Sequence, residues 1–345
     1  MWCRLGCFVF LFAGSYAVAQ NESQRLDLAL PTDNDAIFHG GGAAFYQYIE
    51  RDYKGAKSWP WEGGQYGFVR NPVATKAGLV YTRFHEGIDI KPSHRDAAGE
   101  PLDEVRAIAD GTVAYTNLVP GFSNYGNYIV IEHRWNGSSY YSLYGHLRSI
   151  AVKAGQHVAK SDPIAVMGYT GEGLNRERAH LHLEINLMLS RQFEAWHATY
   201  FKTDPNHHGL YNGINLSGLD VARLYIALRK RPTLTIPQFL AEQETFFEVT
   251  VPNSPHFDLP KFYPWMMRNR ENVKSAAWKV SFTQSGVPTK IEPSAQAVTE
   301  PQLTFIRSRR IDYTYLTRGW IGGSSGAAYL TESGKRMMQL LTFPE

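Results

Sequence analysis

The segment His180–Ile185, with the sequence HLHLEI, constrains the fold of this chain more than any other stretch. Polar and aliphatic residues alternate strictly, and this period of two is typical of a β-strand. On a strand, His180, His182 and Glu184 share one face, while the three aliphatic residues share the other. The two imidazoles then lie about 7 Å apart along the strand, close enough to reach one small centre. A single histidine is usually a surface residue, but a pair on one face favours a metal or catalytic site.

A second segment, Phe84–Ile90, has the sequence FHEGIDI and begins like the helical zinc signature H-E-x-x-H. It carries Asp89 where that signature needs a second histidine. Gly87 and the two isoleucines disfavour a helix, so we expect a loop at His85 that enters a strand at Gly87. On such a strand Asp89 lies on the face opposite Ile88 and Ile90.

Between Val80 and Leu189, short β-branched and aromatic runs alternate with turn residues, which predicts an all-β unit. The turn dipeptide Asn136-Gly137 lies between two of these runs and predicts an antiparallel hairpin. The second arm of this hairpin leads to Tyr144-Gly145-His146-Leu147. The best strand candidates are Val105–Val119, Gly126–Glu132, Tyr140–Tyr144 and His180–Leu187. The fold class we predict is therefore mainly β, with a compact antiparallel sheet.

The regions on either side of this unit have a different sequence pattern. Residues 20–75 combine glycine with aromatic residues without sustained periodicity, which predicts an irregular segment wrapped around a neighbour. Residues 201–345 predict a smaller accessory α/β module. Its expected elements are helices at Leu219–Lys230 and Pro237–Thr245, a hairpin around Ser285-Gly286, and a final helix at Thr331–Leu341 with Thr331 or Ser333 as its cap.

Residues 1–19 have one positive charge, a short apolar run and small residues near their end, which is typical of a secretory signal peptide. We expect an exported protein, periplasmic or extracellular, with no stable membrane span after the leader is removed. Both cysteines, Cys3 and Cys7, lie in this leader, so any metal must be bound by His, Asp or Glu. Loss of the leader lowers the formal net charge from +3 to +2, which indicates no preference for nucleic acid.

Three motifs follow one another in the order H-x-x-x-D, Y-G-H-L and H-L-H-x-E. In this order, and over roughly residues 75–190, the chain resembles the lysostaphin-type (LytM-like) zinc metallopeptidases, which have the duplicated hybrid motif fold. The resemblance implies a Zn²⁺ cofactor bound by His85, Asp89 and His182, with His146 and His180 lining the site without binding the metal. It also implies a metallopeptidase domain at residues 76–200, between the irregular segment and the C-terminal module.

Three protein ligands leave a fourth tetrahedral position for water, whose pKa zinc lowers towards ~7. His146 or His180 can then act as general base and pass a proton to the leaving amine, while the other stabilises the oxyanion. The sequence leaves open which histidine has which role. Glu86 is expected to be an ordinary neighbour of the site, and Glu184 a partner of a ligand rather than a fourth ligand.

The function predicted from these features is an exported zinc-dependent endopeptidase that hydrolyses peptide cross-links of bacterial peptidoglycan. The alternative is a non-catalytic LytM-like module that binds or activates other cell-wall hydrolases, since relatives with replaced ligand positions have that role. A third reading, a lipoyl-type carrier or sugar phosphotransfer protein, is disfavoured by the predicted leader. The cleaved bond stays open between a D-alanyl–diaminopimelate cross-link, a glycine bridge and a protein, and no partner is predicted for the C-terminal module. The charged segment Thr170–His180 is longer than in the family and is expected to form one wall of the substrate groove.

Overall fold

A computed structural model describes residues 26–344 of the protein, except 48–50, 54–55, 59–62 and 270–274. The predicted leader and both cysteines lie outside these residues. Among the helices of the described chain, none has the length and apolar character needed to cross a bilayer.

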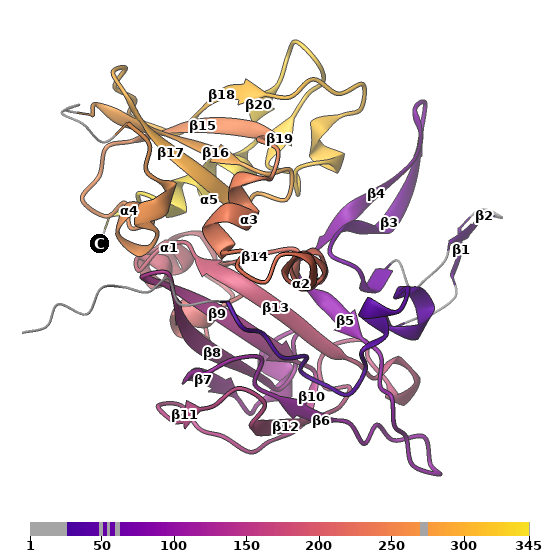
Figure 1. Ribbon diagram of the computed structural model, residues 1–345. Helices are drawn as coiled ribbons and strands as arrows, with labels where there is room; N and C mark the ends of the chain where they lie inside the picture. The colour runs from indigo at the N-terminus through magenta and orange to yellow at the C-terminus, as the bar shows by residue number, and fades with distance from the viewer. Residues whose placement is uncertain (1–25, 48–50, 54–55, 59–62, 270–274, 345) are drawn as a thin grey trace, which may run out of the picture.

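The core of the molecule is a seven-stranded antiparallel sheet, which confirms the predicted mainly β fold (Figure 1). Strand β13 lies near its centre, and all eight of its residues are buried. The aliphatic side chains of β13, which include Leu181 and Leu183, join the main hydrophobic core. The sheet has the order β11-β7-β8-β9-β13-β14, with β5 also paired to β13. Its strands are β5 (Ile88–Ile90), β7 (Gly111–Asn117), β8 (Tyr128–Trp135), β9 (Ser138–Gly145), β11 (His157–Val158), β13 (Leu181–Met188) and β14 (Leu216–Gly218).

A three-stranded antiparallel sheet lies beside the main one and consists of β6 (Glu104–Arg106), β10 (Leu147–Ile150) and β12 (Pro163–Met167). The prediction of one strand over Val105–Val119 is therefore wrong, because β6 and β7 belong to different sheets. Between them the chain turns at residues 107–110, where the backbone of Ile108 hydrogen-bonds the hydroxyl of Tyr144 at 2.9 Å. Ala107 and Ile108 are fully buried, so the turn has the hydrophobicity of a strand.

The hairpin predicted at Asn136-Gly137 joins β8 to β9, with Trp135 and Ser138 as the closing pair. Both turn residues have positive φ, 50° for Asn136 and 74° for Gly137, as a primed two-residue turn requires. Strand β9 then runs from this turn to His146, as expected.

Residues 26–47 wrap along the edge of the two sheets. The amide of Ala29 donates to the carbonyl of Ile108, the amide of Arg106 donates to Pro31, and Tyr46 bridges to Ile90. The elements of this region are two short 3₁₀ turns, η1 (Ala36–Phe38) and η2 (Gly42–Ala44), and two short strands follow it, β1 (Arg51–Tyr53) and β2 (Ala56–Ser58).

The end of the predicted irregular segment is in fact regular. Strand β3 (Gly67–Thr75) pairs with β4 (Gly78–His85) in a long hairpin. Asn71, with φ 55°, and Pro72 interrupt the strand pattern in the sequence, but β4 continues to pair on both sides of them. His85 is therefore the last residue of a strand and not part of a loop, whereas β5 begins at Ile88 as the alternating pattern indicates.

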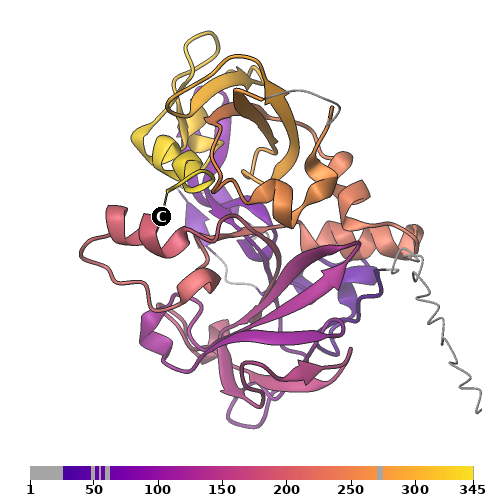
Figure 2. The ribbon, with the colours of Figure 1, turned by 90° about the vertical axis from the view of Figure 1, so that its left-hand side faces the viewer.

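The C-terminal part packs above the main sheet in both views (Figures 1 and 2). Its four-stranded antiparallel sheet has the order β17-β16-β15-β18. The expected hairpin around Ser285-Gly286 joins β16 to β17, and the final helix begins after the Thr331 cap. The remaining helices and strands are α1 (Phe193–Tyr200), α2 (Val221–Lys230), α3 (Ile236–Ala241), α4 (Leu259–Phe262), α5 (Glu332–Leu340), β15 (Phe247–Pro252), β16 (Ala277–Phe282), β17 (Pro288–Ser294), β18 (Gln302–Ile306), β19 (Ile321–Gly322) and β20 (Tyr329–Leu330). Six short 3₁₀ turns complete the described chain: η4 (Pro120–Phe122), η5 (Arg176–Arg178), η6 (Gly209–Tyr211), η7 (Pro264–Met266) and η8 (Tyr313–Tyr315), with the turn at 63–64.

Gly126 lies where its loop contacts the loop that contains Thr170, and a substitution at Gly126 tests this contact. Its φ is +62°, and a Cβ atom there would lie 2.3 Å from the carbonyl carbon of Thr170. Gly126→Ala should lower the free energy of unfolding by about 2–4 kcal/mol, because backbone strain and overpacking both contribute. Gly137→Ala is the matched control, since its φ is +74° but no atom lies within 4 Å. It should cost about 1 kcal/mol from strain alone. Urea denaturation followed by circular dichroism measures both values, and equal losses would contradict the close approach.

Candidate metal centre

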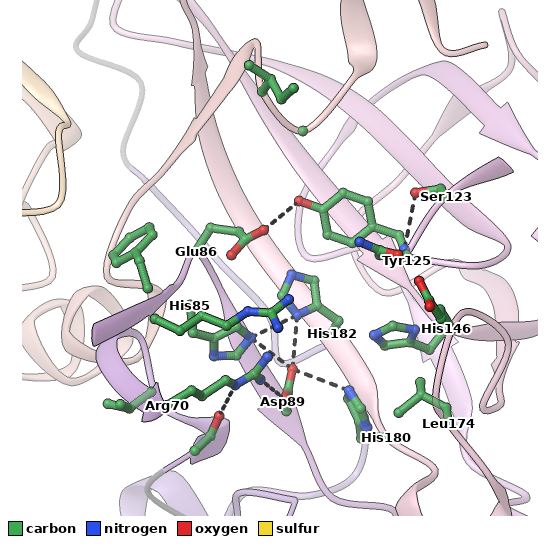
Figure 3. A pocket seen from close by; sticks show the side chains of 18 of the residues that line it. Arg70, His85, Glu86, Asp89, Ser123, Tyr125, His146, Leu174, His180 and His182 are labelled. Atoms are coloured by element: carbon green, nitrogen blue, oxygen red, sulfur yellow. Dashed lines mark hydrogen bonds and ion pairs between the residues drawn. The ribbon is translucent and has the colours of Figure 1, made fainter. Parts of the chain in front are cut away.

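The register between β5 and β13 brings the first two motifs together. Asp89 and His182 are Cα partners in this pairing, although they lie 93 positions apart in the sequence. His85 reaches the same point from the end of β4 (Figure 3). All three side chains are buried, with 1–5% of their surface exposed.

One ligand-type atom from each residue points to a common centre, and the three form a possible metal site. The Nε2 atom of His85 lies 3.1 Å from Nδ1 of His182 and 3.1 Å from Oδ1 of Asp89. The distance between Nδ1 of His182 and Oδ1 of Asp89 is 2.9 Å. Ligand atoms about 2.0–2.1 Å from a tetrahedral zinc would be roughly 3.3 Å apart, so the donor set fits a zinc ion with a small expansion.

The two ligand-type histidines are oriented by their outer nitrogen atoms. Nδ1 of His85 donates to the carbonyl of Gln65 at 2.7 Å, and Nε2 of His182 contacts Oε1 of Glu184 at 2.7 Å. Because a carbonyl only accepts, the inner nitrogen of His85 keeps its lone pair. Glu184 is itself held by Asn186, whose amide donates to its second oxygen at 2.7 Å. Glu184 thus lies beside the candidate metal ligand His182, where a partner of that residue was expected.

The charges of the cluster favour a cation at its centre. Burial alone would lower the pKa of His182, but hydrogen bonds with Asp89 and Glu184 outweigh it and raise the pKa to about 10. Burial would raise the pKa of Asp89, but the charges of His180, His85 and Arg70 hold it well below its ordinary value. Burial lowers the pKa of His85, which favours its neutral, ligating form. Asp89 is therefore an anion among neutral or cationic nitrogens.

His146 and His180 lie together on the other side of the cluster, with ring centroids 4.6 Å apart (Figure 3). Nδ1 of His146 donates to the carbonyl of Thr170 at 2.8 Å, and Nδ1 of His180 donates to the carbonyl of Arg178 at 2.7 Å. In the His146 ring Nε2 is therefore the atom with a free lone pair, whereas Nε2 of His180 lies 3.3 Å from Oδ1 of Asp89. Burial, together with the nearby His180 and His182, lowers the pKa of His146 well below its ordinary value.

His146 also has an unusual backbone, with a φ of 61°. A left-handed conformation is uncommon for a residue other than glycine, and it persists only where the surroundings fix it. Here the amide of His146 donates to the carbonyl of Tyr125 at 2.7 Å, and its ring is held by Thr170. The strain is therefore located at one of the predicted catalytic residues.

These five residues open into a cavity of about 820 Å³. Its walls include Glu172, Leu174 and Arg178 from the long charged loop, in agreement with the expectation that this loop borders a groove. Residues after the predicted domain limit at 200 also contribute, among them Asn212, Ile214 and Arg318. One side of the cavity is therefore built by the C-terminal part of the chain.

Sequence reasoning missed two side chains that touch the cluster. Arg70 of β3 places its guanidinium 2.5 Å from Oδ2 of Asp89 and donates to the carbonyl of Gly63 at 2.8 Å. Tyr125 donates to Glu86 at 3.0 Å, so this carboxylate is partly buried and paired rather than freely solvated. Neither contact could be predicted from the sequence, because Arg70 lies in a segment without periodicity and Tyr125 lies outside the three motifs.

Two histidines outside the three motifs, His133 and His197, are buried, although a single histidine is usually a surface residue. His133 is fully buried between the carbonyl of Asp110 at 2.8 Å and the hydroxyl of Ser142 at 2.7 Å. His197 is 4% exposed and stacks on Phe201, with ring centroids 4.7 Å apart. Both have structural partners, and neither contacts the cluster.

Comparison with known proteins shows to which family the part of the chain that contains the cluster belongs. The family model described as "Peptidase family M23" matches residues 83–193, a range that contains all five clustered residues. Residues 83–193 are a peptidase family M23 domain. The M23 domain begins within β4 and ends at the first residue of α1.

Several known proteins are similar to part of this chain. A "Lipoprotein NlpD/LppB homolog" from Pseudomonas aeruginosa is 39% identical over 90 residues, which is 26% of this chain and 27% of that protein. The "Murein hydrolase activator EnvC" from Escherichia coli is 39% identical over 82 residues, 24% of this chain and 17% of that protein. The catalytic domain of lysostaphin from Staphylococcus simulans is 27% identical, covering 36% of this chain and 82% of that one, with a TM-score of 0.24. The chain thus spans 27% or less of the length of these two curated relatives.

The contact between Glu184 and His182 yields a prediction for metal binding. Glu184→Gln keeps the size of the side chain but removes the charge that orients and polarises His182, so zinc affinity should fall about 10–100-fold. Competition with a chromophoric chelator measures the affinity. Glu132→Gln on β8 is the control, since Glu132 contacts Ser139 and Arg134 instead of the cluster. An unchanged affinity in Glu184→Gln would show that His182 needs no such support.

Proposed function

We propose that this protein is an exported zinc-dependent endopeptidase that hydrolyses peptide cross-links of bacterial peptidoglycan. One observation carries the proposal: the inner atoms of His85, Asp89 and His182 converge on one point, while His146, with a free Nε2 atom, and His180 line the same cavity. Three such ligands beside two bases are the requirements of a metallopeptidase, and the M23 match supports this reading.

A bound Zn²⁺ would supply the Lewis acid that makes water nucleophilic at neutral pH and polarises the scissile carbonyl. The protein supplies the proton transfers. His146 is buried and neutral, so its Nε2 atom can accept a proton and return it to the leaving amine, while Thr170 holds Nδ1 in place. His180, fixed by the carbonyl of Arg178, can donate to the oxyanion from the other side. The division of roles between the two histidines stays a prediction.

The substrate and the location rest on the relatives. Proteins named murein hydrolase activators are similar to part of this chain, and murein is the cell-wall polymer, so a cell-wall substrate is the natural inference for this chain. The residues 1–19, with their signal-peptide pattern, support export to the periplasm or cell exterior, where that polymer lies. Among its cross-links we favour the D-alanyl–diaminopimelate bond.

The decisive test compares zinc content and muropeptide release for residues 20–345 and two variants. The unaltered protein should bind about one zinc ion and release cross-link fragments, as measured by metal analysis and mass spectrometry. His182→Ala should lose both zinc and activity, because it removes a ligand. His146→Ala should keep zinc and lose activity by about 10²–10⁴-fold, because it removes only a base. Loss of zinc in His146→Ala, or activity that survives chelation, would refute these assignments.

A second function has its own support, since the names of several relatives describe activators of murein hydrolases. In this alternative the M23 domain binds or activates another cell-wall hydrolase and does not cut. The two functions are separated by adding a purified cell-wall amidase to the same assay. Stimulation of the amidase by the His146→Ala variant, together with no cleavage by the unaltered protein alone, would favour the activator.

A further inference from the structure

Four arginine side chains line the cavity of the M23 domain: Arg70, Arg83, Arg178 and Arg318. Arg70 pairs with Asp89, and Arg178 donates to the carbonyl of Gly173. In the described part of the chain, neither Arg83 nor Arg318 forms an ion pair with a carboxylate, although four acidic residues line the same cavity. Two guanidinium groups are therefore available to a ligand that enters it.

Arg83 has an unfavourable position unless an anion is near. It lies on β4 two residues before His85, so the two side chains share a face of the hairpin. Its Cα partner across the hairpin is Arg70. Like charges directly opposite one another destabilise a β-hairpin. Asp89 compensates the charge of Arg70, whereas the exposed Arg83 side chain faces the cavity without such compensation.

Arg318 reaches the cavity from the C-terminal part and is held in a defined orientation. Its guanidinium carbon lies 4.8 Å from the ring centroid of Phe84 and 4.9 Å from that of Trp320. Its backbone has a φ of 59°, an uncommon conformation for arginine that indicates a constrained position. Arg318 and the candidate ligand His85 line the same cavity.

We propose that Arg83 and Arg318 bind a free carboxylate of the peptide substrate beside the scissile bond. The inference rests on the proposed function, because it names the kind of peptide that the groove accepts. The planar guanidinium group binds a carboxylate through two parallel hydrogen bonds, and stacking on aromatic rings fixes its plane before the ligand arrives. The cavity of about 820 Å³ is lined both by the polar cluster and by these two arginines.

Binding is tested with a matched pair of synthetic peptides that contain a D-alanyl–diaminopimelate cross-link. One carries free carboxylates and the other carries carboxamides at the same positions. Calorimetric titration should give an affinity at least about tenfold higher for the free carboxylates. Arg83→Gln and Arg318→Gln should each lower this preference, chiefly by weakening binding of the carboxylate peptide.

Controls keep the result specific to the two arginines. Arg134→Gln removes an arginine of β8 that is 74% exposed and outside the cavity, so it should leave the preference unchanged. Because Arg318 packs on Phe84 and Trp320, thermal melting checks each variant for folding. Arg318→Lys keeps the charge but loses the fork, and it should show an intermediate preference.

Equal binding of the two peptides, no binding of either, or a preference that survives both glutamine variants would overturn the inference. Cleavage of the same peptides by the zinc-loaded protein is scored separately. Selective binding without cleavage contradicts the proposed endopeptidase but supports the carboxylate site. Cleavage of both peptides at the same kcat/KM, without selective binding, supports the endopeptidase and overturns the carboxylate site.

Discussion

The pairing of β5 with β13 is the constraint on which the candidate centre depends. It places Asp89 opposite His182, and the short turn before β5 then brings His85 to the same point. Because side chains alternate along a strand, a slip of one residue would turn Asp89 to the other face and bury its carboxylate among aliphatic residues. The aliphatic residues on both strands, Ile88 and Ile90 on β5 and Leu181 and Leu183 on β13, are fully buried and resist such a slip. The hydrophobic core thereby fixes the position of the polar cluster.

Asp89 is the electrostatic centre of this arrangement. Three histidines and Arg70 surround one buried carboxylate, and its two oxygens have separate partners. Oδ1 faces the histidine nitrogens, whereas Oδ2 faces the guanidinium of Arg70. A buried carboxylate without such partners would be protonated, so the surrounding nitrogens keep it ionised and able to bind a cation. On the outer side of the cluster, the carboxylate of Glu184 contacts Nε2 of His182.

The sequence could predict those elements in which residue type and residue spacing indicate the same secondary structure. The alternation of His180–Ile185 predicts β13, and the Asn136-Gly137 turn predicts the β8–β9 hairpin. Apolar residues at helical spacing predict α2, and the Thr331 cap predicts the start of the last helix. The five polar residues of the cluster could be predicted because they lie in three short motifs. Their roles as ligands and bases stay predictions, although the structure brings the side chains together.

Contacts that depend on tertiary packing could not be predicted in this way. Asn71 and Pro72 interrupt the strand pattern in the sequence, so the β3–β4 hairpin could not be predicted. The contact of Arg70 with Asp89, which depends on this hairpin, could not be predicted either. The buried turn at Ala107 and Ile108 looks like a strand because burial, not secondary structure, sets its composition. The contribution of Arg318 to the cavity depends on how the C-terminal part packs on β4, for which no local pattern exists.

The separation of Asp89 and His182 by 93 positions also has a consequence for the order of folding. Local hairpins such as β8–β9 close short loops and can form early, whereas β5 reaches β13 only after a long intervening chain has been arranged. The atoms of the candidate metal centre therefore do not meet in an unfolded or partly folded chain. A zinc ion would stabilise the completed fold without helping to nucleate it. Binding of the ion would then be the final step of maturation, and only a correctly folded chain would hold it.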